Sequence, residues 1–201
     1  MIELNTLNGA DRILRFVQSL IIADFPDDYL IGAEMGVAYG GGIEALGKLW
    51  KGHGMVYGFD TFAGHPKELA LDAKSMEAVC MDEHYVNFGH HKLTYKYQRS
   101  ELDRQGLSNV ILVKGLITGA SCASLPLLHY CLLDLDLLIS MEFGYAAVCD
   151  KIVDGGYLCL HDVLSGVLPG LVPWYAEIKK DWEVIFEGEK EDLAVLRRKS
   201  K

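Results

Sequence analysis

The sequence lacks any cysteine spacing that would bind zinc or build a disulfide framework. It contains five cysteines, an odd number, and no pair has the Cys-x-x-Cys spacing. Cys131 and Cys159 lie within apolar runs, where a thiol ordinarily packs as a small hydrophobic side chain. We therefore expect free thiols in packing roles and a reducing compartment.

Long apolar runs are also missing. No stretch approaches the roughly 18 apolar residues of a membrane span. The segment MIELN at residues 1–5 lacks the basic residues and apolar stretch of a secretory signal. We expect a soluble, cytoplasmic protein that does not use a membrane as a partner.

Positive charge is scarce. The 19 lysines and arginines are outnumbered by 28 aspartates and glutamates, which gives a formal net charge of −9. An acidic surface repels phosphate backbones, so nucleic acid is not expected as a partner. The basic segment at residues 197–201 is the exception, and we interpret it as a solvated tail.

The order of hydrophobic patterns predicts the fold class. Short β-branched runs alternate with longer amphipathic stretches, which is typical of an α/β protein. A chain of 201 residues suits one domain, here residues 1–201. We therefore predict a Rossmann-like, seven-stranded, mostly parallel sheet with helices on both faces.

The individual elements are predicted from apolar spacing and from turn residues. Strands are expected at 29–34, 55–60, 110–114, 130–134, 157–160, 183–186 and 193–196, and helices at 13–21, 43–50, 99–107, 140–153 and 172–180. The last two strands flank a short polar turn and should form an antiparallel hairpin. The pattern weakens between about 64 and 98, where we expect a substrate-facing or lid insertion.

A glycine-rich turn follows the first predicted strand. Residues 34–42 read EMGVAYGGG, with Glu34 before the first glycine, Gly36. Ligands of open α/β sheets bind beyond the carboxyl ends of the strands, and glycine lets the backbone approach them. The Gly-x-Gly-x-x-Gly spacing of dinucleotide-binding proteins is absent, which disfavours NAD and flavin. A carboxylate such as Glu34 suits the amino group and sulfonium of S-adenosylmethionine better than a pyrophosphate. The alternative is a tight turn with no ligand.

Asp60 ends the second predicted strand, about twenty residues beyond the glycines. A carboxylate at this position can accept hydrogen bonds from both ribose hydroxyls of an adenosine. Enzymes that use NAD share this feature. Asp60 therefore predicts a ligand that contains an adenosine, but it does not distinguish S-adenosylmethionine from NAD. The alternative is that Asp60 caps a following helix.

Carboxylates and a histidine follow two other predicted strands. Asp134 and Asp136 close the fourth strand, and His161 and Asp162 close the fifth. Asp134, His161 and Asp162 together could bind a divalent cation, which would lower the pKa of a substrate hydroxyl. Magnesium prefers oxygen ligands, so His161 would favour manganese, iron or zinc. Without a metal, Asp134 or His161 would be a general base. In a purely structural alternative, the acids cap the helices that follow and His161 fills a polar niche.

Several of these segments resemble class I methyltransferases of the macrocin O-methyltransferase-like kind. GFDTFAGHP at residues 58–66 is similar to that family's FDSFEGLP element, and LDLD at 133–136 to its DxD element. GGYLCLHD at 155–162 resembles its GGYxxxDD element, with His161 where an aspartate is usual. VKG at 113–115 resembles the turn that borders the adenine, although Leu116 replaces a frequent acidic residue. The likeness covers roughly residues 28–165.

The resemblance implies a set of site residues. S-adenosylmethionine would be bound by Glu34, Gly36, Tyr39, Gly40, Asp60, Thr61, Phe62, Gly115 and Asp134. Asp134 and His161 would be catalytic, and a divalent cation, magnesium or manganese, would bind Asp134, His161 and Asp162.

These observations favour methyl transfer from S-adenosylmethionine to a small-molecule hydroxyl. The expected partner is the small-molecule methyl acceptor, and analogy with such enzymes also allows a homodimer. One alternative is a non-catalytic protein that binds S-adenosylmethionine, suggested by the altered acidic pair at His161. An NAD(P)-dependent oxidoreductase is less favoured because the dinucleotide fingerprint is missing.

Overall fold

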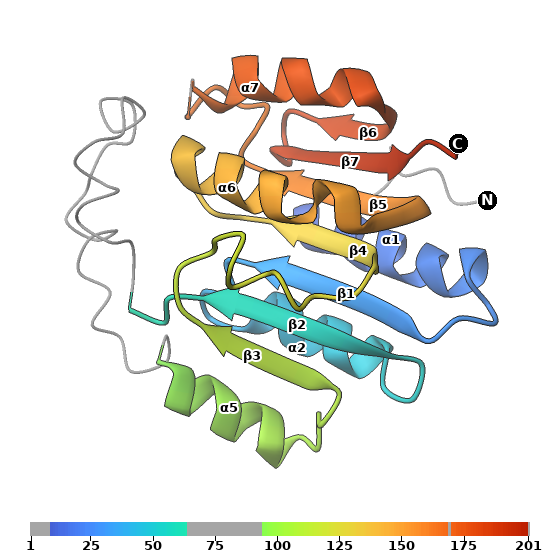
Figure 1. The fold of residues 1–201 in the computed structure, drawn as a ribbon, viewed down its shortest axis with the longest axis vertical. Helices are drawn as coiled ribbons and strands as arrows, with labels where there is room; N and C mark the ends of the chain where they lie inside the picture. Colours follow the sequence, from blue (N-terminus) through green and yellow to red (C-terminus); the bar gives the residue numbers. More distant parts are fainter. Residues whose placement is uncertain (1–8, 64–93, 169, 201) are drawn as a thin grey trace.

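The structure, a computed structural model, describes residues 9–63, 94–168 and 170–200. Its centre is one seven-stranded sheet with the order β3-β2-β1-β4-β5-β7-β6 (Figure 1). The strands are β1 (Leu30–Met35), β2 (Gly54–Asp60), β3 (Val110–Lys114), β4 (Leu128–Leu133), β5 (Ile152–His161), β6 (Trp182–Gly188) and β7 (Leu193–Arg198). The first five strands are parallel, and β7 is antiparallel to both β5 and β6. The predicted sheet and closing hairpin are confirmed.

Helices cover both faces of this sheet. Those within the described ranges are α1 (Ala10–Asp24), α2 (Gly41–Leu49), α5 (Tyr95–Arg104), α6 (Leu138–Val148) and α7 (Leu171–Ile178), with two short 3₁₀ turns, η4 (Cys149–Lys151) and η5 (Lys179–Asp181). Figure 1 shows α6 and α7 on one side of the sheet and α1 and α2 on the other. Among the described residues, no helix combines the length and the apolarity that a membrane crossing requires.

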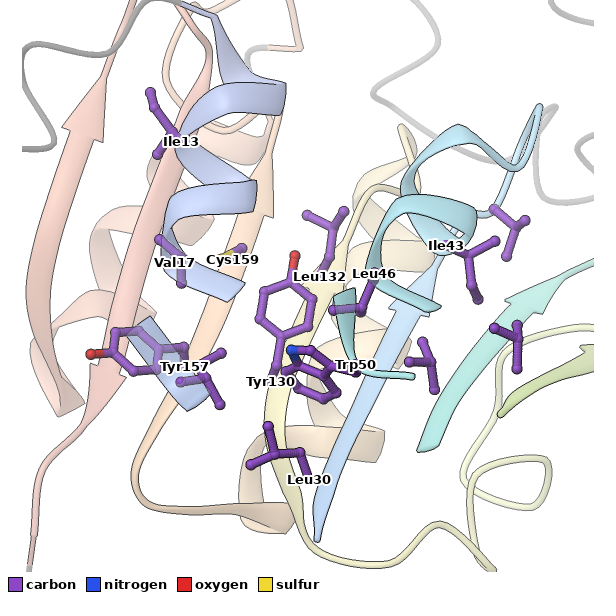
Figure 2. Packing of buried hydrophobic residues seen from close by; sticks show 14 of the residues in the cluster. Ile13, Val17, Leu30, Ile43, Leu46, Trp50, Tyr130, Leu132, Tyr157 and Cys159 are labelled. Atoms are coloured by element: carbon purple, nitrogen blue, oxygen red, sulfur yellow. The ribbon is translucent and has the colours of Figure 1, made fainter. Parts of the chain in front are cut away.

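Trp50 is at the centre of the core beneath α1 and α2 (Figure 2). Its indole lies edge-on to the ring of Tyr130, with 6.3 Å between centroids, and its Nε1 donates to the carbonyl of Gln18 at 3.2 Å. Gly32 leaves the space for this indole, since a Cβ there would lie 2.8 Å from Trp50 Cζ3. A second apolar layer lies beneath α6 and α7. With both faces covered, the central strands are buried, as parallel strands generally are.

The boundary between α6 and β5 differs from the expected one. The sequence pattern predicts a helix to Val153, whereas α6 ends at Val148 and β5 already begins at Ile152. Ile152 pairs with Leu128, and the register then shifts so that Tyr157 pairs with Tyr130. Gly155 lies within this irregularity with a φ of 77°. The prediction was wrong because two adjacent glycines resemble a turn between elements and here lie within one strand.

Helix α5 also begins earlier than predicted. It starts at Tyr95, after Thr94, whose Oγ1 accepts a hydrogen bond from the Tyr97 amide at 3.3 Å. The helix therefore occupies the end of the range assigned to an insertion at about 64–98. The remainder of that range, up to residue 93, lies outside the described residues.

Candidate active site

The predicted site residues all lie at or just after the carboxyl ends of β1, β2, β3, β4 and β5, at one edge of the sheet (Figure 1). The glycine loop, residues 36–40, connects β1 to α2 at this edge. Gly36 has a φ of 96°, and a Cβ there would lie 1.8 Å from the backbone oxygen of Asp134. Gly40 has a φ of 82° and is the N-cap of α2. Contacts within the protein therefore require glycine at both positions, whether or not a ligand binds.

Gln98 of α5 supports the glycine loop through a side-chain hydrogen bond. Its side chain is 4% exposed, and its Nε2 donates to the carbonyl of Ala38 at 3.2 Å. A Cβ at Gly40 would lie 1.9 Å from Gln98 Oε1. Sequence reasoning missed this residue, because the predicted helix began one position after it. A glutamine near the start of a helix does not indicate that its side chain will bond the backbone of a residue 60 positions earlier in the chain.

Glu34 lies beneath the same loop, at 3% exposure. Its carboxylate accepts a hydrogen bond from the backbone of Ile43, in the first turn of α2. It thereby replaces the side-chain cap that Gly40 cannot provide. Its Oε2 is buried without a partner among the described residues. Burial, followed by the nearby charge of Asp134, raises the pKa of Glu34 to about 8. The result is a carboxylate with a free acceptor position in a site where a cation would stabilise its charged form.

Asp60 joins the ends of β1 and β2. Its Oδ1 accepts from the Phe62 amide at 2.7 Å and its Oδ2 from the Ala38 amide at 3.0 Å. Both donors have left-handed backbones, with φ of 51° at Phe62 and 46° at Ala38. The carboxylate thus caps the turn that follows it and fixes the glycine loop. A carboxylate oxygen has further lone pairs, so these bonds leave room for ribose hydroxyls.

The remaining predicted cofactor residues differ in their exposure. Tyr39 is 56% exposed on the glycine loop, and Thr61 is half-buried. Phe62 is buried instead, with its ring edge-on to Tyr95 at 5.4 Å between centroids. Gly115 follows β3, and its amide donates to the backbone carbonyl of Asp60 at 2.9 Å. The side chain of Phe62 therefore belongs to the core, and only its backbone lies beside Asp60.

The acid–histidine cluster, Asp134, His161 and Asp162, confirms that the ends of β4 and β5 meet. His161 Nδ1 lies 3.2 Å from Asp134 Oδ1 and 3.2 Å from Asp162 Oδ1. The hydrogen bond to Asp134, and then that to Asp162, raises the pKa of His161 to about 10. Burial raises the pKa of Asp134, and the contact with His161 opposes this shift. The side chains are partly exposed, so a ligand can reach them.

The same three side chains fit a divalent cation. Each offers one ligand atom, and these atoms lie within 4.8 Å of one another. Two carboxylates and an imidazole form a donor set that suits manganese or iron better than magnesium. Asp134 and Asp162 are not the N-cap residues of the helices that follow them, because those residues are Leu137 for α6 and Gly170 for α7. The structural alternative, in which these acids cap the helices, is therefore not supported.

Comparison with known proteins shows that this fold is similar to those of methyltransferases of solved structure. No protein-family model matches the sequence, and no curated protein matches it. The structure is similar to that of the O-methyltransferase NovP, with a TM-score of 0.75, 17% identity, and 96% of this chain and 81% of that chain covered. It is also similar to an rRNA methylase from Streptococcus thermophilus, with a TM-score of 0.62, 13% identity, and 100% and 99% of the two chains covered.

A third similar structure holds a ligand. This is SMU.1697c of Streptococcus mutans, a "putative methyltransferase" in complex with SAH, with a TM-score of 0.61, 10% identity, and 95% and 98% of the two chains covered. The identities are low, so the comparisons concern the fold, and the narrower likeness to macrocin O-methyltransferases stays a prediction. The strand order, the antiparallel β7 and these structural neighbours together show that the chain has the fold of class I S-adenosylmethionine-dependent methyltransferases.

Proposed function

We propose that this protein transfers the methyl group of S-adenosylmethionine to a hydroxyl oxygen of a small molecule. The proposal rests on one observation, which is that two features lie together at the same edge of the sheet. One is the glycine loop above the buried, unpartnered carboxylate oxygen of Glu34. The other is the acid–histidine cluster, which begins at Asp134, the residue whose backbone oxygen touches Gly36.

The residues of the sheet edge fit the cofactor by their chemistry. S-adenosylmethionine supplies an electrophilic methyl group on a sulfonium and also carries an ammonium group. The free oxygen of Glu34 suits the ammonium, because a cation offsets the desolvation that raises the pKa of Glu34. The lone pairs of Asp60 suit the ribose, and Gly115, which is bonded to Asp60, suits the adenine side.

The acid–histidine cluster supplies the groups that methyl transfer to oxygen needs. The hydroxyl of the acceptor loses a proton, and we assign this proton to Asp134, the residue of the cluster whose backbone oxygen lies against Gly36 of the glycine loop. His161 contacts both aspartates through Nδ1 and so fixes their orientation. Alignment of the hydroxyl with the methyl group and removal of one proton are together sufficient for the reaction. A divalent cation bound by the same residues would lower the pKa of the hydroxyl.

Charge supports a small acceptor over a nucleic acid. The chain carries a net charge of −9, and the proposed site contains the carboxylates of Asp60, Asp134 and Asp162. A phosphate backbone would be repelled at such an edge. The similarity to an rRNA methylase therefore does not extend the proposal to RNA. A homodimer and a cytoplasmic location stay predictions, which light scattering and fractionation would check.

The test is calorimetric titration of the cofactor-free protein with S-adenosylmethionine, with NADH, and with manganese or magnesium in separate runs. We expect micromolar binding of S-adenosylmethionine and none of NADH. Asp60→Asn should weaken this binding at least tenfold, because one acceptor oxygen becomes a donor. Asp27→Asn is the matched control, since Asp27 is exposed and precedes the opposite end of β1. Binding of NADH instead, or of neither compound, would contradict the proposal.

A further inference from the structure

The turn between β6 and β7 reaches the acid–histidine cluster through Asp192. The backbone oxygen of Asp192 accepts a hydrogen bond from the Asp162 amide at 2.8 Å. Its carboxylate Oδ1 accepts from the amides of Leu164 at 2.6 Å and Ser165 at 2.9 Å. One residue thus binds three amides of the segment that begins with Asp162.

This segment needs external support. Asp162 has a φ of 60°, in the left-handed region, and the residues between Asp162 and α7 form no helix or strand among those described. An amide in such a segment has no ladder partner, so a side chain or water must satisfy it. A left-handed aspartate also persists only where its neighbours hold it in place.

Asp192 itself is anchored to the rigid part of the sheet. Its amide donates to the carbonyl of Glu189 at 3.3 Å, which closes the turn. The next residue, Leu193, is fully buried and pairs with His161 in the ladder between β5 and β7. The support for Asp162 is therefore connected directly to the strand that carries His161.

We propose that Asp192 is a positioning residue, which fixes the turn at Asp162 so that the Asp162 carboxylate meets Nδ1 of His161. The inference rests on the proposed function of the acid–histidine cluster. Asp192 acts only through the backbone of residues 162–165 and does not touch the reacting atoms. Its carboxylate is therefore needed as a hydrogen-bond acceptor and not as a charge.

Three variants separate the role of the Asp192 carboxylate as a hydrogen-bond acceptor from an effect of its charge. Asp192→Gly removes the carboxylate acceptor, keeps the backbone oxygen that binds the Asp162 amide and, unlike alanine, tolerates the φ of 47° at this position without strain. Asp192→Asn keeps Oδ1, tolerates the same backbone and removes the charge. Glu189→Gln removes one negative charge from the same turn, and its side chain is exposed.

The first readout is nuclear magnetic resonance at one fixed pH. In Asp192→Gly we expect faster amide exchange at Leu164 and Ser165 together with displaced ring resonances of His161. Asp192→Asn and Glu189→Gln should resemble the wild type. Ring resonances of His161 that stay in place in Asp192→Gly would overturn the proposal, even if the two amides exchange faster. Equal changes in Asp192→Asn would overturn it as well.

The second readout is manganese binding, followed by electron paramagnetic resonance. Loss of an outer residue that orients a metal ligand typically weakens affinity about 10- to 100-fold. We expect a loss in this range for Asp192→Gly and affinity close to the wild type for the other two variants. Wild-type affinity in Asp192→Gly would overturn the positioning role. If the wild-type protein itself binds no manganese, the metal-assisted form of the proposed function fails, and the resonance readout alone decides the role of Asp192.

Discussion

The α-carbon of Gly36 lies directly against the backbone oxygen of Asp134, so closely that a Cβ atom at Gly36 would lie 1.8 Å from that oxygen. The Asp134 amide also donates to the carbonyl of Met35 at 2.9 Å. The loop proposed to bind the cofactor and the first residue of the acid–histidine cluster are therefore in contact through their backbones. A displacement of one must displace the other.

Gly36→Ala should damage both the fold and the site. The new methyl group would meet backbone atoms that cannot rotate away, and the φ of 96° is unfavourable for alanine. We expect a loss of at least about 2 kcal/mol in the free energy of unfolding, measured by chemical denaturation, and weak binding of S-adenosylmethionine. Gly41→Ala is the control, since nothing lies within 4 Å of its Cβ position. Alanine there should be neutral or stabilising by up to about 1 kcal/mol.

Asp134→Asn should separate catalysis from cofactor binding. The variant keeps the size of the side chain but cannot accept a proton, so turnover should fall by at least about 100-fold. The affinity for S-adenosylmethionine should change by less than about tenfold. Methyl transfer to a panel of small hydroxyl compounds and calorimetry measure the two quantities. Asp136→Asn, two residues away and outside the cluster, should retain most of the turnover. Unchanged turnover in Asp134→Asn would remove this residue from the mechanism.

Glu34 should make the protein less stable at alkaline pH. The pKa of Glu34 is raised from 4.5 to about 8 in the folded state, so the unfolded state releases this proton first. Stability then falls as the pH rises from about 4.5 to 8, and Glu34→Gln should remove this part of the pH dependence. The difference should reach a few kcal/mol, because one pKa unit corresponds to about 1.4 kcal/mol. Urea unfolding of both proteins at pH 5 and pH 9 measures it. Parallel stability curves would show that Glu34 is charged in the folded protein.

Gly40 and Gln98 should be energetically coupled. Gly40→Ala places a methyl group against the Oε1 of Gln98 and adds the strain of a positive φ. Gln98→Ala removes the bond to Ala38 and opens space below the loop. The double variant should therefore lose about 1 kcal/mol less than the sum of the single losses. Denaturation of the four proteins gives this coupling, and strictly additive losses would contradict the contact.

The sheet could be predicted from sequence because its central strands are buried on both faces. Buried strands produce continuous apolar runs, such as residues 130–133 in β4, a strand whose six residues are all buried. The order of these runs also predicts that the ends of β4 and β5 meet, and the contacts of His161 with Asp134 and Asp162 confirm this. The limits of β5 were wrong because a glycine pair in the middle of a strand resembles a turn.

Other features of the site leave no pattern in the sequence. Glu34 is predicted as a carboxylate that faces a ligand, and its burial and its role as the cap of α2 leave no sign in the sequence. Gln98 and Asp192 support loops through hydrogen bonds to backbone atoms, 60 and 28 residues away in the chain. Almost every residue type has the same backbone amide and carbonyl. The sequence therefore does not show which backbone atom a side chain such as Gln98 or Asp192 will bond.

The position of β7 has a consequence for how the protein is made. This strand follows β6 in the chain but lies between β6 and β5 in the sheet. During vectorial synthesis on a ribosome, β5 is complete well before residues 193–198 emerge, so its hydrogen-bonding edge is open to other chains until then. The arrival of β7 closes this edge and, in the same event, brings Asp192 to the turn at Asp162. A nascent chain therefore gains its protection from aggregation and its finished site together.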